Sequence, residues 1–220
     1  MDSKEKPEVG VGPHPRPWPD DPRLDRALLE HGDRRNVVDG YRYWSVPAIR
    51  EDLRRRAHPF HVAIENWQHD FNIGAVVRNA NAFGAAGVHI IGRRAWNRRG
   101  AMKTEAYLDV QRHETVEQCA EWSRREGLTL VGVDNLPGAR DLRTTQLQRR
   151  SMLLLGQEGP GLSEPARAAV EMIVSIPQYG STRSINAGAA SAIAMYEWVR
   201  QHAGPQPLSG PATSPPASGG

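Results

Sequence analysis

Short apolar runs alternate with amphipathic segments through most of the chain, from residue 60 to residue 202. Five of the runs are rich in Val, Ile and Leu and predict buried strands: FHVAIEN, GVHIIG, LTLVGVD, MLLLG and MIVSIP. Helical spacing of apolar positions predicts helices over 73–83, 116–125, 164–170 and 187–202. Strands that alternate with helices indicate an α/β fold, in which helices cover both faces of a parallel sheet.

The two ends of the chain lack this pattern. Residues 1–20 hold too many prolines and glycines to form a core, so we expect a disordered arm, and residues 204–220 predict a second disordered tail. Between the arm and the α/β domain at 58–203, residues 21–57 predict a basic helical extension. One short helix is expected over 22–30 with Asp21 as its cap, and a second after Ser45. The arginine-rich side of this second helix could bind a phosphate backbone, or it could be an ordinary face exposed to solvent.

Polar and glycine residues follow several of the predicted strands. In a parallel sheet, ligands bind at the carboxyl ends of the strands, so these residues are expected to converge. The last such stretch, IPQYGSTRSINAGAASAIAMYEW, has the form of a strand, a polar loop and a helix. Unpaired N–H groups at the start of a helix suit a phosphate, a carboxylate or the polar edge of a nucleotide. An ordinary capped helix is the alternative, because Ser184 and Asn186 are both good N-cap residues.

Three stretches share the order and spacing of a known set of motifs: NIGAVVRNANAFGAAG, LLLGQEGPGLSE and the loop before the last helix. They resemble the motifs of the SPOUT RNA methyltransferases, in particular the TrmH or SpoU branch, over residues 60–202. The matching positions are Asn72, Gly74, Arg78, Phe83 and Gly84 in the first motif, Gly156, Glu158, Gly161, Leu162 and Ser163 in the second, and Ile176, Pro177, Gly180, Ser184 and Asn186 in the third.

The third motif departs from the family pattern at four positions. Gln178 stands where the family usually has Met, and Ile185 where it usually has Leu. Ala187 and Gly188 replace the Val and Ser that are often found there. The changes at Gln178 and Ile185 remove no polar group that we expect in the site.

The resemblance implies a C-terminal trefoil knot, a homodimer with active sites near the subunit interface, and S-adenosyl-L-methionine as the cofactor. It implies cofactor contacts at Gly156, Ile176, Ser184, Ile185, Val133 and Asp134. It implies a catalytic set of Arg78, Asn72, Glu158, Ser184 and Asn186.

Each residue of the catalytic set has an expected role. Arg78 stabilises the ribose oxygen as it loses its proton, because a guanidinium stays protonated and is a poor base. Asn72 caps the helix that carries Arg78. Glu158 orients one of the two or, as the alternative, only orders its loop by satisfying backbone amides. Ser184 and Asn186 position the target nucleotide or the amino-acid end of the cofactor.

Charge and composition are compatible with this interpretation. The net charge is +3 and the pI about 9.3, which is in the range of nucleic-acid-binding proteins. Arginines cluster at 54–56, 93–94, 98–99, 124–125 and 149–150, where they could contact nucleic acid or could be ordinary solvated surface. The single Cys119 excludes an internal disulfide, and no apolar run reaches the ~20 residues of a membrane helix. We therefore expect a cytoplasmic protein that does not bind membranes. His58 and His61 lack matching ligands, so no metal is expected.

The sequence thus predicts an enzyme that methylates ribose 2′-hydroxyls of RNA. Transfer RNA is favoured over ribosomal RNA, because the residues before 58 are too few and too helical for the ribosomal-protein-like domain of many ribosomal-RNA members. A catalytically silent RNA-binding or assembly protein with the same fold is the alternative. An unrelated nucleotide-binding α/β domain would not share the spacing of the three motifs.

Overall fold

The computed structural model describes residues 10–66, 72–93, 95–96 and 98–204. The described residues fall into two compact units, one before Leu53 and one from Leu53 to Gly204. Helix α2 (Val46–Arg56) runs through the boundary. Each unit is described by itself.

The smaller unit contains α1 (Arg26–His31), the 3-10 helix η1 (Asp39–Tyr41) and the start of α2. The cap of α1 is Asp25, whose carboxylate accepts hydrogen bonds from the backbone N–H groups of Ala27 and Leu28. The prediction of Asp21 as the cap was wrong, because the Asp21 carboxylate is engaged by the backbone and guanidinium of Arg23. The second predicted start is confirmed, since the Ser45 hydroxyl accepts a hydrogen bond from the Ala48 N–H.

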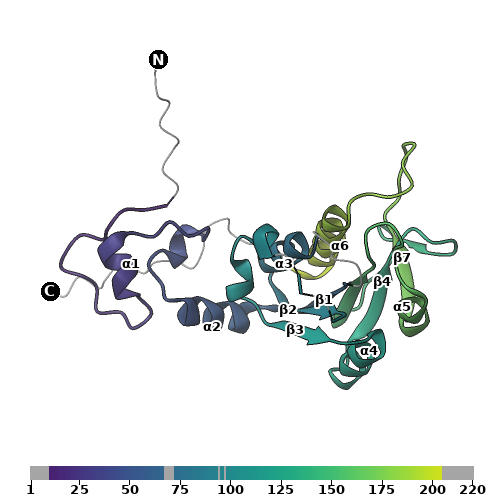
Figure 1. Cartoon of the computed structure of the whole chain (residues 1–220), viewed down its shortest axis with the longest axis horizontal. Helices are drawn as coiled ribbons and strands as arrows, with labels where there is room; N and C mark the ends of the chain where they lie inside the picture. Colours follow the sequence, from purple (N-terminus) through teal and green to yellow (C-terminus); the bar gives the residue numbers. More distant parts are fainter. Residues whose placement is uncertain (1–9, 67–71, 94, 97, 205–220) are drawn as a thin grey trace, which may run out of the picture. The chain divides into compact units, whose positions relative to one another are not determined.

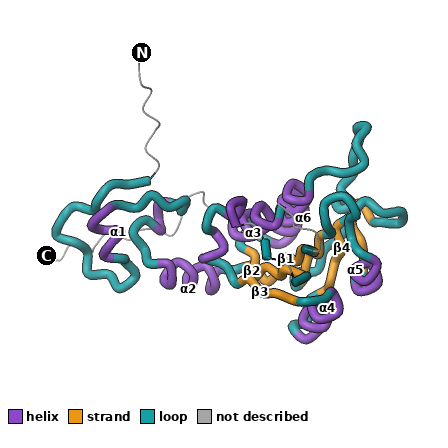
Figure 2. Tube along the Cα trace, in the orientation of Figure 1, coloured by secondary structure: helices purple, strands orange, loops and turns teal. Residues whose placement is uncertain are grey.

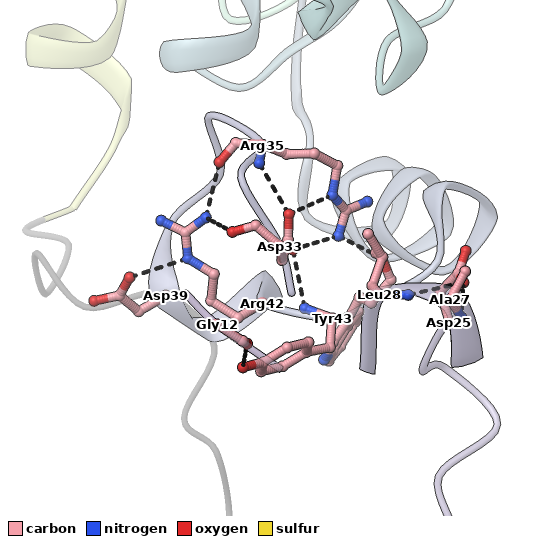
Figure 3. A network of polar contacts seen from close by, with 10 residues as sticks. Gly12, Asp25, Ala27, Leu28, Asp33, Arg35, Asp39, Arg42 and Tyr43 are labelled. Atoms are coloured by element: carbon pink, nitrogen blue, oxygen red, sulfur yellow. Dashed lines mark hydrogen bonds and ion pairs between the residues drawn. The ribbon is translucent and has the colours of Figure 1, made fainter. Parts of the chain in front are cut away.

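A buried carboxylate, Asp33, organises the loops of this unit (Figure 3). The guanidinium of Arg35 donates to both of its oxygens, at 2.9 and 2.7 Å, and the backbone N–H of Tyr43 donates at 3.0 Å. Burial on its own raises the pKa of Asp33, but the bonds from Arg35 and Tyr43 outweigh burial and hold the pKa below its ordinary value. The ionised carboxylate is therefore part of the folded unit.

Part of the expected N-terminal arm is paired with this network. Val11 forms a two-way backbone bridge with Asp33, and the N–H of His14 donates to the carbonyl of Leu29. Composition did not predict this order, because the pairing uses backbone groups that any residue except proline supplies. Residues 1–9 and 205–220 of the expected arm and tail lie outside the described residues.

The larger unit is built on seven parallel strands, which confirms the parallel α/β prediction (Figures 1 and 2). Their order across the sheet is β3-β2-β1-β6-β4-β7-β5. The strands are β1 (His58–Glu65), β2 (Ala85–Ile91), β3 (Val110–His113), β4 (Thr129–Val133), β5 (Arg140–Asp141), β6 (Ser151–Leu155) and β7 (Met172–Ser175). The short edge strands β3 and β5 were not predicted, because their sequences, VQRH and RD, are polar.

Helices cover both faces of the sheet (Figure 1). On one face lie α3 (Ile73–Ala82) and α6 (Ala187–His202), and on the other lie α4 (Val116–Arg125) and α5 (Glu164–Ala169). Two further 3-10 helices, η2 (Arg98–Ala101) and η3 (Thr104–Ala106), follow β2. Alternate residues of β1 enter different cores: Val62 packs in the cluster of Trp198, and Ala63 in the cluster of Cys119. Among the described helices, none combines the length and the hydrophobicity that a bilayer span requires.

Four neighbouring strands end in register at one edge of the sheet. Ile64 of β1 pairs with Leu155 of β6, and Val133 of β4 pairs with Leu155 on one side and Val174 of β7 on the other. The last residue of β4, Val133, and the segments that follow the four strands contain all the predicted site residues. The carboxyl edge is where parallel sheets bind ligands.

Candidate functional site

Three side chains from distant segments form one hydrogen-bonded chain at this edge. The carboxamide nitrogen of Asn72 donates to Oε2 of Glu158 at 2.5 Å. Its oxygen accepts a bond from Nδ2 of Asn186 at 2.7 Å. The Asn186 oxygen in turn accepts the backbone N–H of Ala189, in the first turn of α6. We call Asn72, Glu158 and Asn186 the polar triad.

The polar triad fixes the orientation of the Asn72 carboxamide. A carboxylate only accepts hydrogen bonds, so the nitrogen of Asn72 must face Glu158 and its oxygen must face Asn186. The structure therefore brings together three of the five predicted catalytic residues, and Glu158 orients Asn72 as predicted.

Asn72 and Asn186 each stand at the start of a helix, but only one of the two side chains caps its helix. Asn186 is the N-cap of α6, which is what the alternative of an ordinary capped helix predicted. Asn72 precedes α3 but its side chain makes no capping bond, so the prediction that Asn72 caps this helix was wrong. Its backbone carbonyl accepts the N–H of Val76, while its side chain turns to the polar triad. A charge-assisted bond to Glu158 is stronger than a neutral capping bond, which accounts for the difference.

Arg78 and Ser184 stay outside the polar triad. Arg78 is an exposed residue of α3, and its side chain has no hydrogen bond or ion pair with any residue that the structure describes. Ser184 is exposed too, and its carbonyl accepts the hydroxyl of Thr182. A guanidinium in this position is open to an incoming anionic ligand.

The loop after β6 is closed tightly on itself. Gln157 and Gly161 exchange two backbone hydrogen bonds, at 3.1 and 3.0 Å. A Cβ atom on Gly156 would lie 2.0 Å from the carbonyl carbon of Gly161, and one on Gly161 would lie 2.4 Å from Oδ2 of Asp134. Glycine is therefore required at both positions.

Asp134 fixes this loop to the end of β4. Its Oδ2 accepts the N–H of Leu162 at 2.8 Å, and its Oδ1 accepts the N–H of Asn135 at 2.7 Å. The predicted cofactor residues Val133, Asp134 and Gly156 are thus neighbours. The structure places Ile176 just after β7 and Ile185 just before α6, both half-buried.

Three residues of this region were not predicted. Glu65, buried at the end of β1, accepts the N–H of Ser163 at 2.9 Å and so ties β1 to the same loop. Asn79 of α3 donates to the carbonyl of Gly188 and to the hydroxyl of Ser191, both in α6. Gln178 has buried amide atoms that find no partner among the described residues. Only Glu65 had a sequence signal, a charge at the end of an apolar strand.

A row of three histidines lies on the face of the sheet that α4 covers, beside Trp122 of that helix. Nδ1 of His61 lies 3.0 Å from Nε2 of His89, and Nδ1 of His89 lies 2.8 Å from Nε2 of His113. Burial lowers the pKa of His61 to about 4 and that of His89 to about 2, and it also lowers the pKa of His113. These imidazoles are therefore neutral near pH 7.

The same region gathers possible metal ligands that the sequence did not single out. Ligand atoms of His89, His113 and Cys119 lie within 4.8 Å of one another. However, the two imidazoles are paired with each other, the Cys119 thiol donates to Met152, and burial raises its pKa to about 12. In the described residues these groups form a hydrogen-bonded cluster with a protonated thiol, and the expectation of no metal stays a prediction.

Comparison with known proteins gives similarity over the α/β unit. Residues 59–196, more than half of the chain, match the model of the SpoU rRNA Methylase family. A tRNA (guanosine(18)-2′-O)-methyltransferase of Escherichia coli is 28% identical over 156 residues, which cover 70% of this chain and 68% of the relative. The enzyme of the same name in Thermus thermophilus is 29% identical over 158 residues, which cover 70% of this chain and 80% of the relative.

Solved structures resemble the same unit. The SpoU methyltransferase AviRb of Streptomyces viridochromogenes, in complex with the cofactor AdoMet (S-adenosylmethionine), aligns with a TM-score of 0.59 and 31% identity over 66% of this chain. An AdoMet-bound rRNA methyltransferase of Sinorhizobium meliloti aligns with a TM-score of 0.59 and 27% identity over 68% of the chain. The aligned parts cover 58% and 60% of those two chains. With the fold, the three motifs and the family model in agreement, the chain belongs to the SpoU rRNA Methylase family.

Proposed function

We propose that this chain transfers a methyl group from S-adenosylmethionine to a ribose 2′-hydroxyl of RNA. The observation that carries the proposal is the polar triad, because three segments far apart in sequence meet at the ligand-binding edge of the sheet. Family membership and the cofactor-bound neighbours support the same chemistry.

The residues at the carboxyl edge fit this cofactor. Gly156 lacks a side chain beside a loop that is closed by its own backbone bonds, and Gln178 presents unpaired amide atoms. Gly156, Ile176, Ser184, Ile185, Val133 and Asp134 are the residues we assign to holding it. When bound, S-adenosylmethionine supplies an electrophilic methyl group on a sulfonium.

The protein then positions the ribose and stabilises charge. The guanidinium of Arg78, which stays protonated, holds the phosphate next to the target and stabilises the 2′-oxygen as its proton passes to phosphate or water. Asn72, held by Glu158, and Asn186 orient the sugar. In-line positioning of this kind accounts for a large part of the rate in group transfer.

Transfer RNA is the substrate we propose, with guanosine at position 18 as the first candidate. The support is the activity named for the two relatives, both tRNA (guanosine(18)-2′-O)-methyltransferases. An exposed aromatic residue in the loop before α6 suits base stacking: Tyr179 is 83% exposed, and Arg143 donates to its hydroxyl at 2.7 Å. A tRNA substrate is consistent with the expected cytoplasmic location.

A homodimer and a C-terminal knot complete the proposal. Support for the dimer comes from α6, where Ile193 is 42% and Tyr196 is 59% exposed. Large apolar side chains of this kind are enriched in interfaces between subunits. Support for the knot comes from the family match, which includes the segment before α6.

Methyl transfer to defined RNAs tests the proposal. The purified protein is incubated with labelled cofactor and either transfer RNA or ribosomal RNA, and with a transcript in which guanosine 18 is replaced by adenosine. We expect label in transfer RNA and its loss from the replaced transcript. Cofactor binding by calorimetry without transfer to any RNA would favour the silent alternative.

A further inference from the structure

Gln178 has a buried side-chain amide, and neither its nitrogen nor its oxygen forms a hydrogen bond within the described part of the chain. Neither Nε2 nor Oε1 has a hydrogen-bond partner among the described residues, although both atoms are shielded from solvent. Buried polar groups in folded proteins are nearly always paired, because leaving one unpaired costs its full desolvation free energy. The amide is therefore poised for a group that arrives from outside the described chain.

The position of Gln178 places that group at the proposed cofactor site. The residue lies three positions after the end of β7, in the segment that leads to Asn186. Strand β7 runs parallel to β4, whose last residue is Val133, so the carboxyl ends of both strands lie at the same edge of the sheet. Ile176, which we assign to the cofactor, is two positions away.

The amide is a feature of this chain and not a requirement of the fold. Proteins with this motif usually have methionine here, whose thioether fills space and needs almost no hydrogen bond. Glutamine has a similar length but presents an N–H donor beside a carbonyl acceptor.

The pattern of donor and acceptor indicates the ligand group. Adenine presents its N6 amino donor next to the N7 ring-nitrogen acceptor, and a glutamine amide pairs with both at once. A buried amide suits an enclosed small ligand better than a nucleotide bound at the surface. We propose that the Gln178 side chain recognises the edge of the cofactor's adenine and determines specificity for it. This inference rests on the proposed function.

Binding of two product analogues tests it. S-adenosylhomocysteine carries the adenine amino group, and S-inosylhomocysteine carries a carbonyl in its place. The N7 edge of the inosyl compound therefore has two acceptors, and no orientation of the Gln178 amide pairs fully with both. Affinities for both are measured by calorimetry with the full-length wild type and with Gln178→Met, which restores the residue usual in the family. Gln146→Met is the matched control, because Gln146 is exposed.

We expect the wild type to prefer the adenosyl compound by at least about tenfold, equivalent to one strong hydrogen bond. Gln178→Met should lose about tenfold in affinity for this compound and little for the inosyl compound. The ligand-free variant should also melt about 2–4 °C higher, because two unpaired atoms are gone. A variant with a merely damaged fold would melt lower and lose both affinities.

Unchanged affinity and preference in Gln178→Met would overturn the inference. So would intact cofactor binding combined with altered RNA affinity or altered mass in light scattering, since the amide would then face RNA or a second copy of the chain. Failure of the wild type to bind either compound would instead contradict the proposed function itself. The two failures are thus separate.

Discussion

The carboxamide nitrogen of Asn72 lies 2.5 Å from Oε2 of Glu158, although the residues are 86 positions apart in sequence. This contact joins the start of α3 to the loop after β6, and Asn186 extends it to the start of α6. The geometry leaves Asn72 one orientation. The site is therefore preorganised before any ligand binds.

Asn72→Ala should lower kcat by about 100-fold, as expected when one preorganised polar group is lost. The free energy of unfolding should fall by only about 1–2 kcal/mol, since the other triad members retain partners. Methyl transfer kinetics and urea unfolding measure the two effects. Asn135→Ala, at an exposed position, is the control. Equal losses of activity in both variants would contradict the role of the triad.

Arg78→Lys should keep the fold but lose most of the activity. The Arg78 side chain has no partner among the described residues, so the change in unfolding free energy should stay within about 0.5 kcal/mol. We expect kcat to fall by about 100-fold, because lysine cannot reproduce the planar fork of donors. RNA affinity, measured by filter binding, should change little. A retained rate at normal affinity would rule out a specific guanidinium role.

Gly156→Ala should abolish cofactor binding and destabilise the α/β unit by more than about 2 kcal/mol, because the added methyl group meets the backbone of Gly161 at 2.0 Å. Gly180→Ala is a matched control: no described atom lies within 4 Å of its added Cβ, and its φ is ordinary. Calorimetry and thermal unfolding should separate the two variants. Normal cofactor affinity in Gly156→Ala would show that the closed loop is not the binding element.

Acid should destabilise the protein through the histidine row. The pKa values of His61 and His89 are lowered in the folded state, to about 4 and about 2. Between pH 6.5 and pH 4, His61 and His89 are therefore protonated in the unfolded chain but remain neutral in the folded chain. Stability that is complete above pH 6.5 should fall by about 1.4 kcal/mol per pH unit for each histidine.

Urea midpoints at pH 7, 6 and 5 measure this loss. His61→Gln should flatten the slope, whereas His31→Gln, at an exposed position, should leave it unchanged. A wild-type midpoint that is constant from pH 7 to pH 5 would contradict the lowered pKa values.

The sequence predicted those elements whose hydrophobic pattern is decisive. The ends of α4 and α6 agree with the predicted residues, because apolar periodicity and a capping side chain mark the same boundary. Strand β5 could not be found this way, since it has only two residues and both are polar. Local rules also failed at Asn72, where a tertiary partner competes with the helix end for the same side chain.

The candidate site was predictable in part for the same reason. Motif spacing identified the three residues of the polar triad, but not the bonds between them. Glu65 and Asn79 act through contacts that bridge 98 and 109 positions, which no local pattern contains. The unpaired amide of Gln178 became visible only when its surroundings were known.

The most direct test of ribose methylation by this chain is identification of the methylated nucleoside by mass spectrometry, after transfer RNA has reacted with S-adenosylmethionine and the purified protein. We predict a 2′-O-methylated nucleoside whose yield falls by about 100-fold with Asn72→Ala. A nucleoside methylated on its base, or no product from a folded protein that binds the cofactor, would contradict it.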